Sequence, residues 1–164
     1  MNVFLLRHGK AEEVRAGGDA GRKLTRQGRD DIATVARWMA DQDFEFERIA
    51  TSPFARARET AEIVAATLDM PDHIEIWEML VPGGSPDTIC HELGRFSDDP
   101  GLLLVGHEPL LSALISRIIS GDPGSGIVMT KGGLAKIRDF SFSRRPAGEL
   151  HWLLTARQIA GMMK

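Results

Sequence analysis

The sequence has a single cysteine, Cys90, so the chain forms no internal disulfide and a reducing compartment is expected. The apolar residues around Cys90 follow a helical pattern, which favours a packing role over a nucleophilic one. The N-terminus shows no basic segment followed by a long apolar one, as a signal peptide would. No apolar run approaches the roughly 20 residues that a membrane-spanning helix needs. We therefore expect a cytoplasmic protein with no membrane partner.

The sequence also lacks an excess of basic charge, because its formal net charge is −3. No basic stripe alternates with aromatic residues, which argues against a nucleic-acid partner. The short basic pair Arg144-Arg145 precedes Pro146 and is typical of a solvated turn. Since no heptad pattern or long apolar edge stands out, we expect a monomer.

Motifs for metal and nucleotide binding are missing as well. The chain contains no His-Glu-x-x-His, no Cys-x-x-Cys and no Walker pattern, and His73, His91 and His151 are scattered. We therefore expect neither a metal site nor a cofactor.

The 164 residues, 43% of them hydrophobic, suffice for one domain, residues 1–164, with a substantial core. Apolar runs of strand length alternate with segments of helical period, which predicts an α/β fold with a mostly parallel sheet. Expected strands cover 2–6, 48–51, 73–77, 102–105, 127–129, 134–142 and 150–154, and 12–23 is expected to be a loop. Helices are expected to start at Thr25, Ser52, Ser85 and Pro109 and to run to about Ala40, Leu68, Phe96 and Gly121.

Two histidines directly follow two of the expected buried strands. Arg7 and His8 follow the run 3–6, and His107 follows the run 102–105 after Gly106. Ligands of open α/β sheets bind at the carboxyl ends of the strands. The sequence therefore predicts that both imidazoles lie at one edge of the sheet, with the Arg7 guanidinium beside them.

A third strand end supplies an anion-binding helix start. Arg56 lies on the first turn of the helix that follows Ser52-Pro53, where free backbone N–H groups carry a partial positive charge. The planar fork of arginine matches phosphate oxygens. Two arginines and two histidines at such a place predict a cage for a phosphoryl dianion, with Ser52 close to it. An imidazole can then act as nucleophile through one ring nitrogen while the other is held by a hydrogen bond.

The ordered set of motifs resembles the histidine phosphatase superfamily. It consists of Arg7-His8-Gly9, Arg22-Lys23-Leu24-Thr25-x-x-Gly28, Ser52-Pro53-x-x-Arg56-Ala57-x-x-Thr60-Ala61 and Gly106-His107-Glu108-Pro109. The short length and the segments Pro82-Gly83-Gly84-Ser85-Pro86 and Lys131-Gly132-Gly133-Leu134 are similar to its SixA-type phosphohistidine phosphatase branch.

The resemblance implies a three-layer fold with helices on both faces of the central sheet. It also implies that His8 is the nucleophile and forms a phosphohistidine intermediate, while Arg7, Arg56 and His107 hold the phosphoryl oxygens. Arg22 matches a basic residue near the pocket mouth, and Ser52 and Glu78 join it as candidate substrate-binding residues. Whether Arg22 and Lys131 contact substrate is left open. The implied activity is metal-independent hydrolysis of phosphohistidine on a partner protein.

The chain departs from the larger members of the superfamily at the general acid. Those members supply a carboxylate after the third strand, where this chain has only Glu78, displaced by about one residue. A one-residue shift in an extended segment turns a side chain to the other face. An alcohol leaving group needs protonation by a positioned acid, whereas imidazole leaves more readily. A weak or missing acid therefore favours phosphohistidine over ordinary phosphomonoesters.

Two other functions remain open from the sequence. One is a phosphatase for a small phosphomonoester such as a sugar phosphate or nucleotide, which would need a working acid, with Glu78 as its candidate. The short chain argues against this phosphatase, because little sequence is left for a substrate-capping insertion, and a mutase of the phosphoglycerate type is disfavoured for the same reason. The other is a phosphate-binding module without turnover, against which the retained nucleophile candidate His8 argues.

Overall fold

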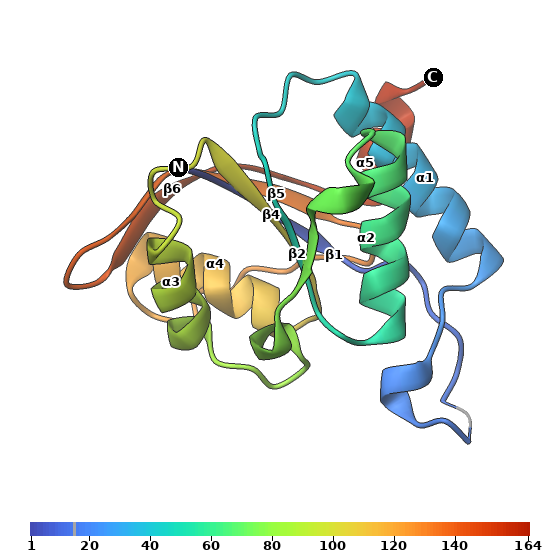
Figure 1. Ribbon diagram of the computed structural model, residues 1–164, viewed down its shortest axis with the longest axis horizontal. Helices are drawn as coiled ribbons and strands as arrows, with labels where there is room; N and C mark the ends of the chain where they lie inside the picture. Colours follow the sequence, from blue (N-terminus) through green and yellow to red (C-terminus); the bar gives the residue numbers. More distant parts are fainter. Residues whose placement is uncertain (15) are drawn as a thin grey trace.

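The computed structural model describes residues 1–14 and 16–164, and these residues form a six-stranded mixed sheet with the strand order β3-β2-β4-β1-β5-β6 (Figure 1). The four strands β1 to β4 pair in parallel, whereas β5 is antiparallel to both β1 and β6. The expected mostly parallel sheet is therefore confirmed. The strands are β1 (Asn2–Arg7), β2 (Ile49–Thr51), β3 (Ile74–Ile76), β4 (Gly101–Gly106), β5 (Leu134–Phe142) and β6 (Pro146–Leu154).

Helices cover both faces of this sheet, which confirms the three-layer architecture (Figure 1). One face carries α1 (Arg26–Ala40), α2 (Ala55–Thr67) and α5 (Ala156–Met162), and the other carries α3 (Pro86–Gly94) and α4 (Leu110–Ser120). Short 3₁₀ turns lie at Asp19–Gly21, Pro71–His73 and Glu78–Leu80. Within the described ranges, none of the helices has the length and apolar character needed to cross a membrane.

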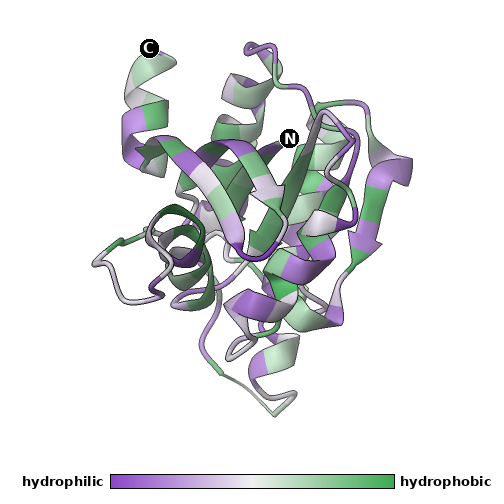
Figure 2. Cartoon of the chain, turned by 90° about the vertical axis from the view of Figure 1, so that its left-hand side faces the viewer, coloured by the Kyte–Doolittle hydropathy of each residue, from purple (hydrophilic) through white to green (hydrophobic). Residues whose placement is uncertain are grey.

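Strand β1 shows why the sheet is buried on both sides. Val3 and Leu5 pack into the core under α3 and α4, whereas Phe4 and Leu6 pack into the core under α1 and α2. Successive side chains of a strand point to opposite faces, so a strand covered on both sides reads as a continuous apolar run. Figure 2 shows hydrophobic residues on the inner strands and hydrophilic ones on the outer surfaces of the helices.

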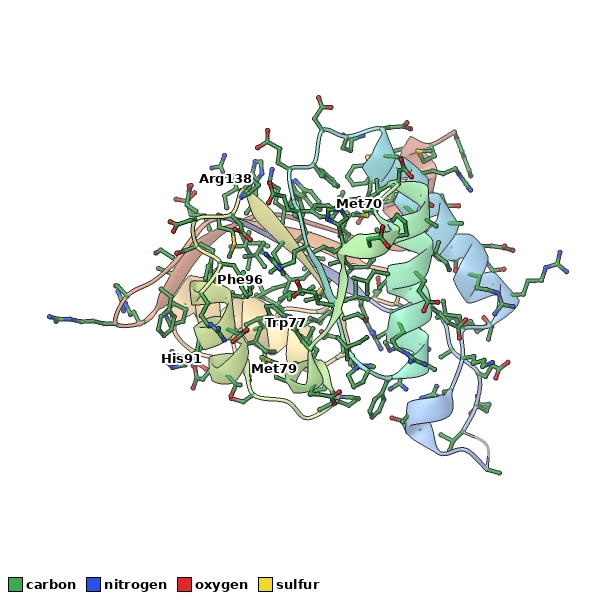
Figure 3. The ribbon with its side chains drawn as sticks, in the orientation of Figure 1. Met70, Trp77, Met79, His91, Phe96 and Arg138 are labelled. Atoms are coloured by element: carbon green, nitrogen blue, oxygen red, sulfur yellow. The ribbon has the colours of Figure 1, made fainter. Side chains whose placement is uncertain are left out.

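The edge of the sheet at β3 is closed by aromatic stacking. Trp77, which follows β3, stacks on Phe96 with ring centroids 5.8 Å apart (Figure 3). The guanidinium of Arg48 lies over the same Phe96 ring at 4.5 Å. These contacts hold the 77–80 segment against the α3 layer, beside the carboxyl end of β4.

Three of the predicted helix ends are confirmed in detail. Thr25 caps α1 by accepting a hydrogen bond from the Gly28 N–H, and Ser85 caps α3 by accepting one from the Thr88 N–H. Gly121 ends α4 with a φ of 80°, a left-handed conformation that glycine adopts without a steric penalty.

Several expected elements differ in the structure. Ser52 is not an N-cap, because its N–H still donates to the Val105 carbonyl and α2 begins only at Ala55. The segment 127–129 is not a strand, since both sides of β1 are already paired with β4 and β5. Strand β6 begins earlier than expected, and α5 was not expected at all. Arg15, within the expected loop 12–23, lies outside the described residues.

Two glycines allow the first turn of α1 to lie on the turn that follows β1. A Cβ on Gly28 would come within 2.1 Å of the Lys10 carbonyl oxygen, and one on Gly9 within 2.9 Å of the Gly28 carbonyl oxygen. The Thr25 N–H donates to the same Lys10 carbonyl at 2.9 Å. The backbone after His8 is therefore fixed by direct contact with α1.

This contact predicts that Gly28→Ala destabilises the protein, although alanine is the better helix former. The added methyl would collide with backbone, and overpacking of this kind typically costs about 1–3 kcal/mol. Gly161→Ala is the matched control, because Gly161 is also helical and a Cβ there meets nothing within 4 Å. We expect urea unfolding to show a lower free energy of unfolding for Gly28→Ala and an equal or higher one for Gly161→Ala. Equal stability of both variants would contradict the close contact.

Candidate active site

The parallel register of β1 and β4 brings His8 and His107 together. Arg7 pairs with Gly106, so each histidine lies one residue beyond the same rung of the ladder. The His8 N–H donates to the Gly106 carbonyl at 3.0 Å, and the two imidazole centroids are 5.1 Å apart. The prediction that both imidazoles lie at one edge of the sheet is confirmed.

The hydrogen bonds of His8 leave Nε2 with a lone pair that faces the site. Nδ1 lies 2.7 Å from the Gly9 carbonyl oxygen, which can only accept, so the ring proton is assigned to Nδ1. Arg56 Nε donates to His8 Nε2 at 3.3 Å. Burial, together with the charges of Arg56, Arg7 and Lys131, lowers the pKa of His8 to about 4, and the Gly9 hydrogen bond opposes this shift. The imidazole is therefore neutral at pH 7, as a nucleophile must be.

His107 is held in place by Ser52. Ser52 Oγ lies 2.8 Å from His107 Nε2 and accepts from the Phe54 N–H at 3.2 Å. If the hydroxyl proton points to Nε2, His107 carries its own proton on Nδ1, which leaves fewer polar groups without partners than the reverse assignment. Burial, followed by His8 and Arg56, lowers the pKa of His107 to about 3. A neutral His107 then offers an Nδ1–H donor.

Arg56 lies on the first turn of α2, as predicted, and is tied to an acidic residue that the sequence analysis did not select. Its Nη1 donates to the Asp19 carbonyl at 2.9 Å and its Nη2 to the Asp19 carboxylate at 3.2 Å. Arg56 is 5% exposed, so this ion pair is shielded from water on one side. The hydrogen bond from Arg22, with burial opposing and Arg56 assisting, lowers the pKa of the Asp19 carboxyl.

Arg7 is anchored at one end only. Its Nη1 donates to the Met129 carbonyl at 2.9 Å, while its buried Nε has no hydrogen-bond partner. Burial lowers the pKa of Arg7, Glu108 opposes this shift and Arg56 adds to it. Arg7, which is half-buried, and Arg56, which is buried, are thus two cations beside the same two imidazoles.

The site contains two hydrogen-bond donors without partners. Three buried side-chain polar atoms lack a partner among the described residues, and two of them are Arg7 Nε and His107 Nδ1. A buried polar group without a partner costs about 1–3 kcal/mol, so it implies a ligand that the site expects. An anion with several oxygens, placed next to His8 Nε2, would satisfy both donors and the Nε of Arg56. The arrangement can therefore hold a phosphoryl group in line with an imidazole nucleophile.

Of the other predicted residues, Ser52 contacts an imidazole, whereas Arg22 and Lys131 have other hydrogen-bond partners or none among the described residues. Arg22 binds the Glu12 carbonyl and the Asp19 carboxylate, so it reaches Arg56 only through Asp19. Ser52 is fully buried and contacts His107. Lys131 is exposed in the turn after Thr130, and the Gly132 N–H of that turn donates to the carbonyls of Arg7 and His8.

Glu78 is exposed at the start of a 3₁₀ turn. The end of this turn, at Leu80, lies beside Gly106. Among the described residues no hydrogen bond or ion pair joins the Glu78 carboxylate to either imidazole or either arginine of the site. The structure thus brings His8, His107, Arg7 and Arg56 together and leaves Glu78 at the periphery.

The sequence analysis assigned no role to two supporting residues. Asp19 carried no signal beyond being an acidic residue in a glycine-rich loop. Thr60 Oγ1 accepts from the Gly9 N–H at 3.2 Å and donates to the Arg56 carbonyl at 2.7 Å, so it joins the loop of His8 to α2. Thr60 belongs to the motif that carries the family resemblance, and its place one helical turn after Arg56 also indicates this role.

Other potentially reactive groups do not enter the site. Cys90 is fully buried in the core under α3 and α4, and burial raises the pKa of its thiol to about 12. This supports the packing role expected for it. In the described part of the chain, no three histidine, cysteine, aspartate or glutamate side chains are grouped as metal ligands would be.

Comparisons with known proteins agree with this geometry. Residues 3–81 match the sequence profile of the histidine phosphatase superfamily (branch 1). Phosphohistidine phosphatase SixA of Escherichia coli (strain K12) is 33% identical over 74% of this chain and 76% of its own length. A structure of the protein histidine phosphatase SixA complexed with tungstate superposes with a TM-score of 0.87 at 28% identity, over 97% of this chain and 99% of that one.

The chain is also similar to a phosphatase that is named for a different substrate. The adenosylcobalamin/alpha-ribazole phosphatase of Salmonella typhi is 27% identical, over 73% of this chain and 80% of its own length. The SixA likeness is higher in identity and covers nearly the whole fold. On these grounds, the chain belongs to the histidine phosphatase superfamily, as a SixA-type member.

Proposed function

We propose that this chain is a phosphohistidine phosphatase that acts on proteins through a covalent intermediate on His8. The observation that carries the proposal is the neutral His8 imidazole, whose Nε2 contacts Arg56 in a site where Arg7 Nε and His107 Nδ1 lack partners. The SixA relatives support the choice of phosphohistidine as substrate.

In the first step, His8 Nε2 attacks phosphorus as the phosphorus–nitrogen bond of the substrate breaks. The substrate imidazole takes one proton from solvent and departs as a neutral ring. Arg7, Arg56 and His107 donate to the three equatorial oxygens, where charge is spread in the transition state. These donors are fixed beforehand by Met129, Asp19 and Ser52, so little reorganisation accompanies the reaction.

In the second step, water attacks the phosphorus of phosphorylated His8. The bond between Nε2 and phosphorus breaks, and inorganic phosphate leaves with the proton balance closed by solvent. The Gly9 carbonyl keeps the proton of His8 on Nδ1 throughout, which stabilises the ring as it gains positive charge on phosphorylation. Ser52 serves as a positioning residue for His107 rather than as a contact to the phosphoryl group.

A second candidate function is hydrolysis of a small phosphomonoester, for which the Salmonella typhi relative is the supporting observation. An alkoxide leaving group would need a proton donor close to the departing oxygen. Glu78 is the available carboxylate after β3, and its exposed position without contacts to the site makes this function the weaker choice.

The test of the main proposal is release of phosphate from a phosphohistidine-bearing protein, beside a phosphoserine peptide and a sugar phosphate. We expect His8→Ala to abolish turnover, since the Nε2 of the other neutral imidazole, His107, is occupied by Ser52, and EDTA to leave the rate unchanged. Removal of such a nucleophile typically lowers kcat by several orders of magnitude, about 10⁴-fold or more. Loss of activity on chelation, or turnover by His8→Ala, would contradict the mechanism.

Glu78→Gln separates the two candidate functions. Because the carboxylate is exposed and contacts no site residue, we expect kcat/KM for the phosphohistidine protein to change less than about twofold. Glu75→Gln is unsuitable as a control because Glu75 pairs with Arg48, so Glu62→Gln on the exposed side of α2 is preferred. A tenfold loss of sugar-phosphate hydrolysis in Glu78→Gln alone would instead identify the acid and favour the second function.

Asp19→Asn tests whether an internal carboxylate competes with the substrate for Arg56. Removing the negative charge of Asp19 beside Arg56 should tighten binding of a dianion such as tungstate by roughly 1 kcal/mol, or about fivefold. Isothermal titration with tungstate measures this shift, and Asp72→Asn, which alters an exposed acidic residue on a distant 3₁₀ turn, is the control. Weaker binding in Asp19→Asn would show that Asp19 orients Arg56 instead of competing for it.

A further inference from the structure

A groove leads away from the candidate active site between α1 and α5. It has a volume of about 570 Å³ and is lined by Arg7, Thr130 and Lys131 near the imidazoles and by Asp31, Ala156 and Arg157 farther on. A second hollow of about 280 Å³ shares the last three residues and continues along both helices. We call this continuous depression the α1–α5 groove.

The groove is continuous with the site because the turn at residues 130–133, which forms its near wall, is hydrogen-bonded to the end of β1. The Gly132 N–H donates to the carbonyls of Arg7 and His8, both at 3.1 Å. A Cβ on Gly132 would lie 3.1 Å from the Ala156 side chain, so the same turn also contacts α5. Figure 1 shows α5 beside α1, and both helices pack into the core on the same face of the sheet.

The groove carries more positive than negative charge. Its lining contains three cationic side chains, those of Arg7, Lys131 and Arg157, and one carboxylate, that of Asp31. The Asp31 carboxylate already accepts a hydrogen bond from Gln27 at 2.7 Å. Lys131 and Arg157 are exposed, and the described part of the chain offers neither of them an ion pair. The hydrolysis mechanism gives Arg157 no task. Two solvated cations next to a phosphoryl site are suited to a substrate that has further negative charge beside its phosphate.

We propose that the α1–α5 groove docks an acidic segment of the protein that bears the phosphohistidine. The inference rests on the proposed function and deepens it, because it assigns the part of the substrate outside the phosphorylated side chain. A free phosphoimidazole fills only the cage around His8, whereas a protein segment extends past Lys131 and reaches Arg157. Complementary charge of this kind increases the association rate and selects partners.

The experiment compares two substrates for each variant. The protein probes are a histidine-containing phosphotransfer domain and a phosphotransferase carrier protein, each phosphorylated on histidine, and the small probe is N-phosphoimidazole. Arg157→Glu reverses the charge at the far part of the groove. Arg144→Glu makes the same change in the exposed turn between β5 and β6, which lies at the amino end of β1, whereas the imidazoles lie at its carboxyl end.

For Arg157→Glu we expect kcat/KM on the faster protein probe to fall about tenfold, with the rate on N-phosphoimidazole within twofold of the unaltered chain. Arg144→Glu should leave both rates within twofold. The unaltered chain should also lose protein-probe activity as salt rises, because exposed charges are screened. Equal losses on both substrates, or no loss on the protein probe, would overturn the docking site.

A steric variant gives a second reading that does not depend on charge. Ala160 lies in the continuation of the groove, half-buried on α5. Ala160→Trp should fill the groove and lower only the protein-probe rate, with thermal unfolding as a check on the fold. Failure of the unaltered chain to hydrolyse either phosphohistidine substrate would refute the proposed function itself. Hydrolysis of N-phosphoimidazole with no dependence on Arg157 or Ala160 would refute the docking site alone.

Discussion

The parallel ladder between β1 and β4 is the constraint on which the site depends. Six consecutive residue pairs hold Asn2 to Arg7 beside Gly101 to Gly106, and a histidine directly follows each strand. A shift of one residue in this register would send one imidazole to the opposite face of the sheet. The two histidines meet because both strands end at the same paired rung, and the apolar cores on both faces of the sheet hold this register.

The electrostatics of the site follow from burying cations beside imidazoles. Burial lowers the pKa of both histidines far below neutrality, so neither adds to the charge of Arg7 and Arg56. The arginines are partly compensated by the Met129 carbonyl and by Asp19. What remains is a pocket with excess positive charge, two donors without partners, and the His8 Nε2 lone pair, which accepts a long hydrogen bond from Arg56 Nε. Such a pocket binds a phosphoryl group through groups that are already oriented, which is the condition for efficient charge stabilisation.

The sequence was most informative where a local rule applies. Apolar runs identified β1 and β4, cap residues located α1 and α3, and strand ends located His8, His107 and Arg7. The helix start at Ser52-Pro53 was misplaced because Ser52 is committed to β4 through its backbone and to His107 through its hydroxyl. Asp19 could not be predicted, since its pairing with Arg56 spans 37 residues and depends on how the loop folds back. Helix α5 did have a local signal, because Thr155 and Gln158 form a capping box.

Strand β1 also determines how the molecule presents itself to a large partner. The chain enters the sheet at the edge opposite the imidazoles, where the Met1 carbonyl accepts a hydrogen bond from the Phe140 N–H. The turn between β5 and β6 lies at that same edge. An affinity handle or surface attachment at Met1 would therefore orient every molecule with its phosphoryl pocket toward the solution. A handle after α5 would instead extend from a helix that lines the groove, so the two ends of the chain are not equivalent for immobilisation.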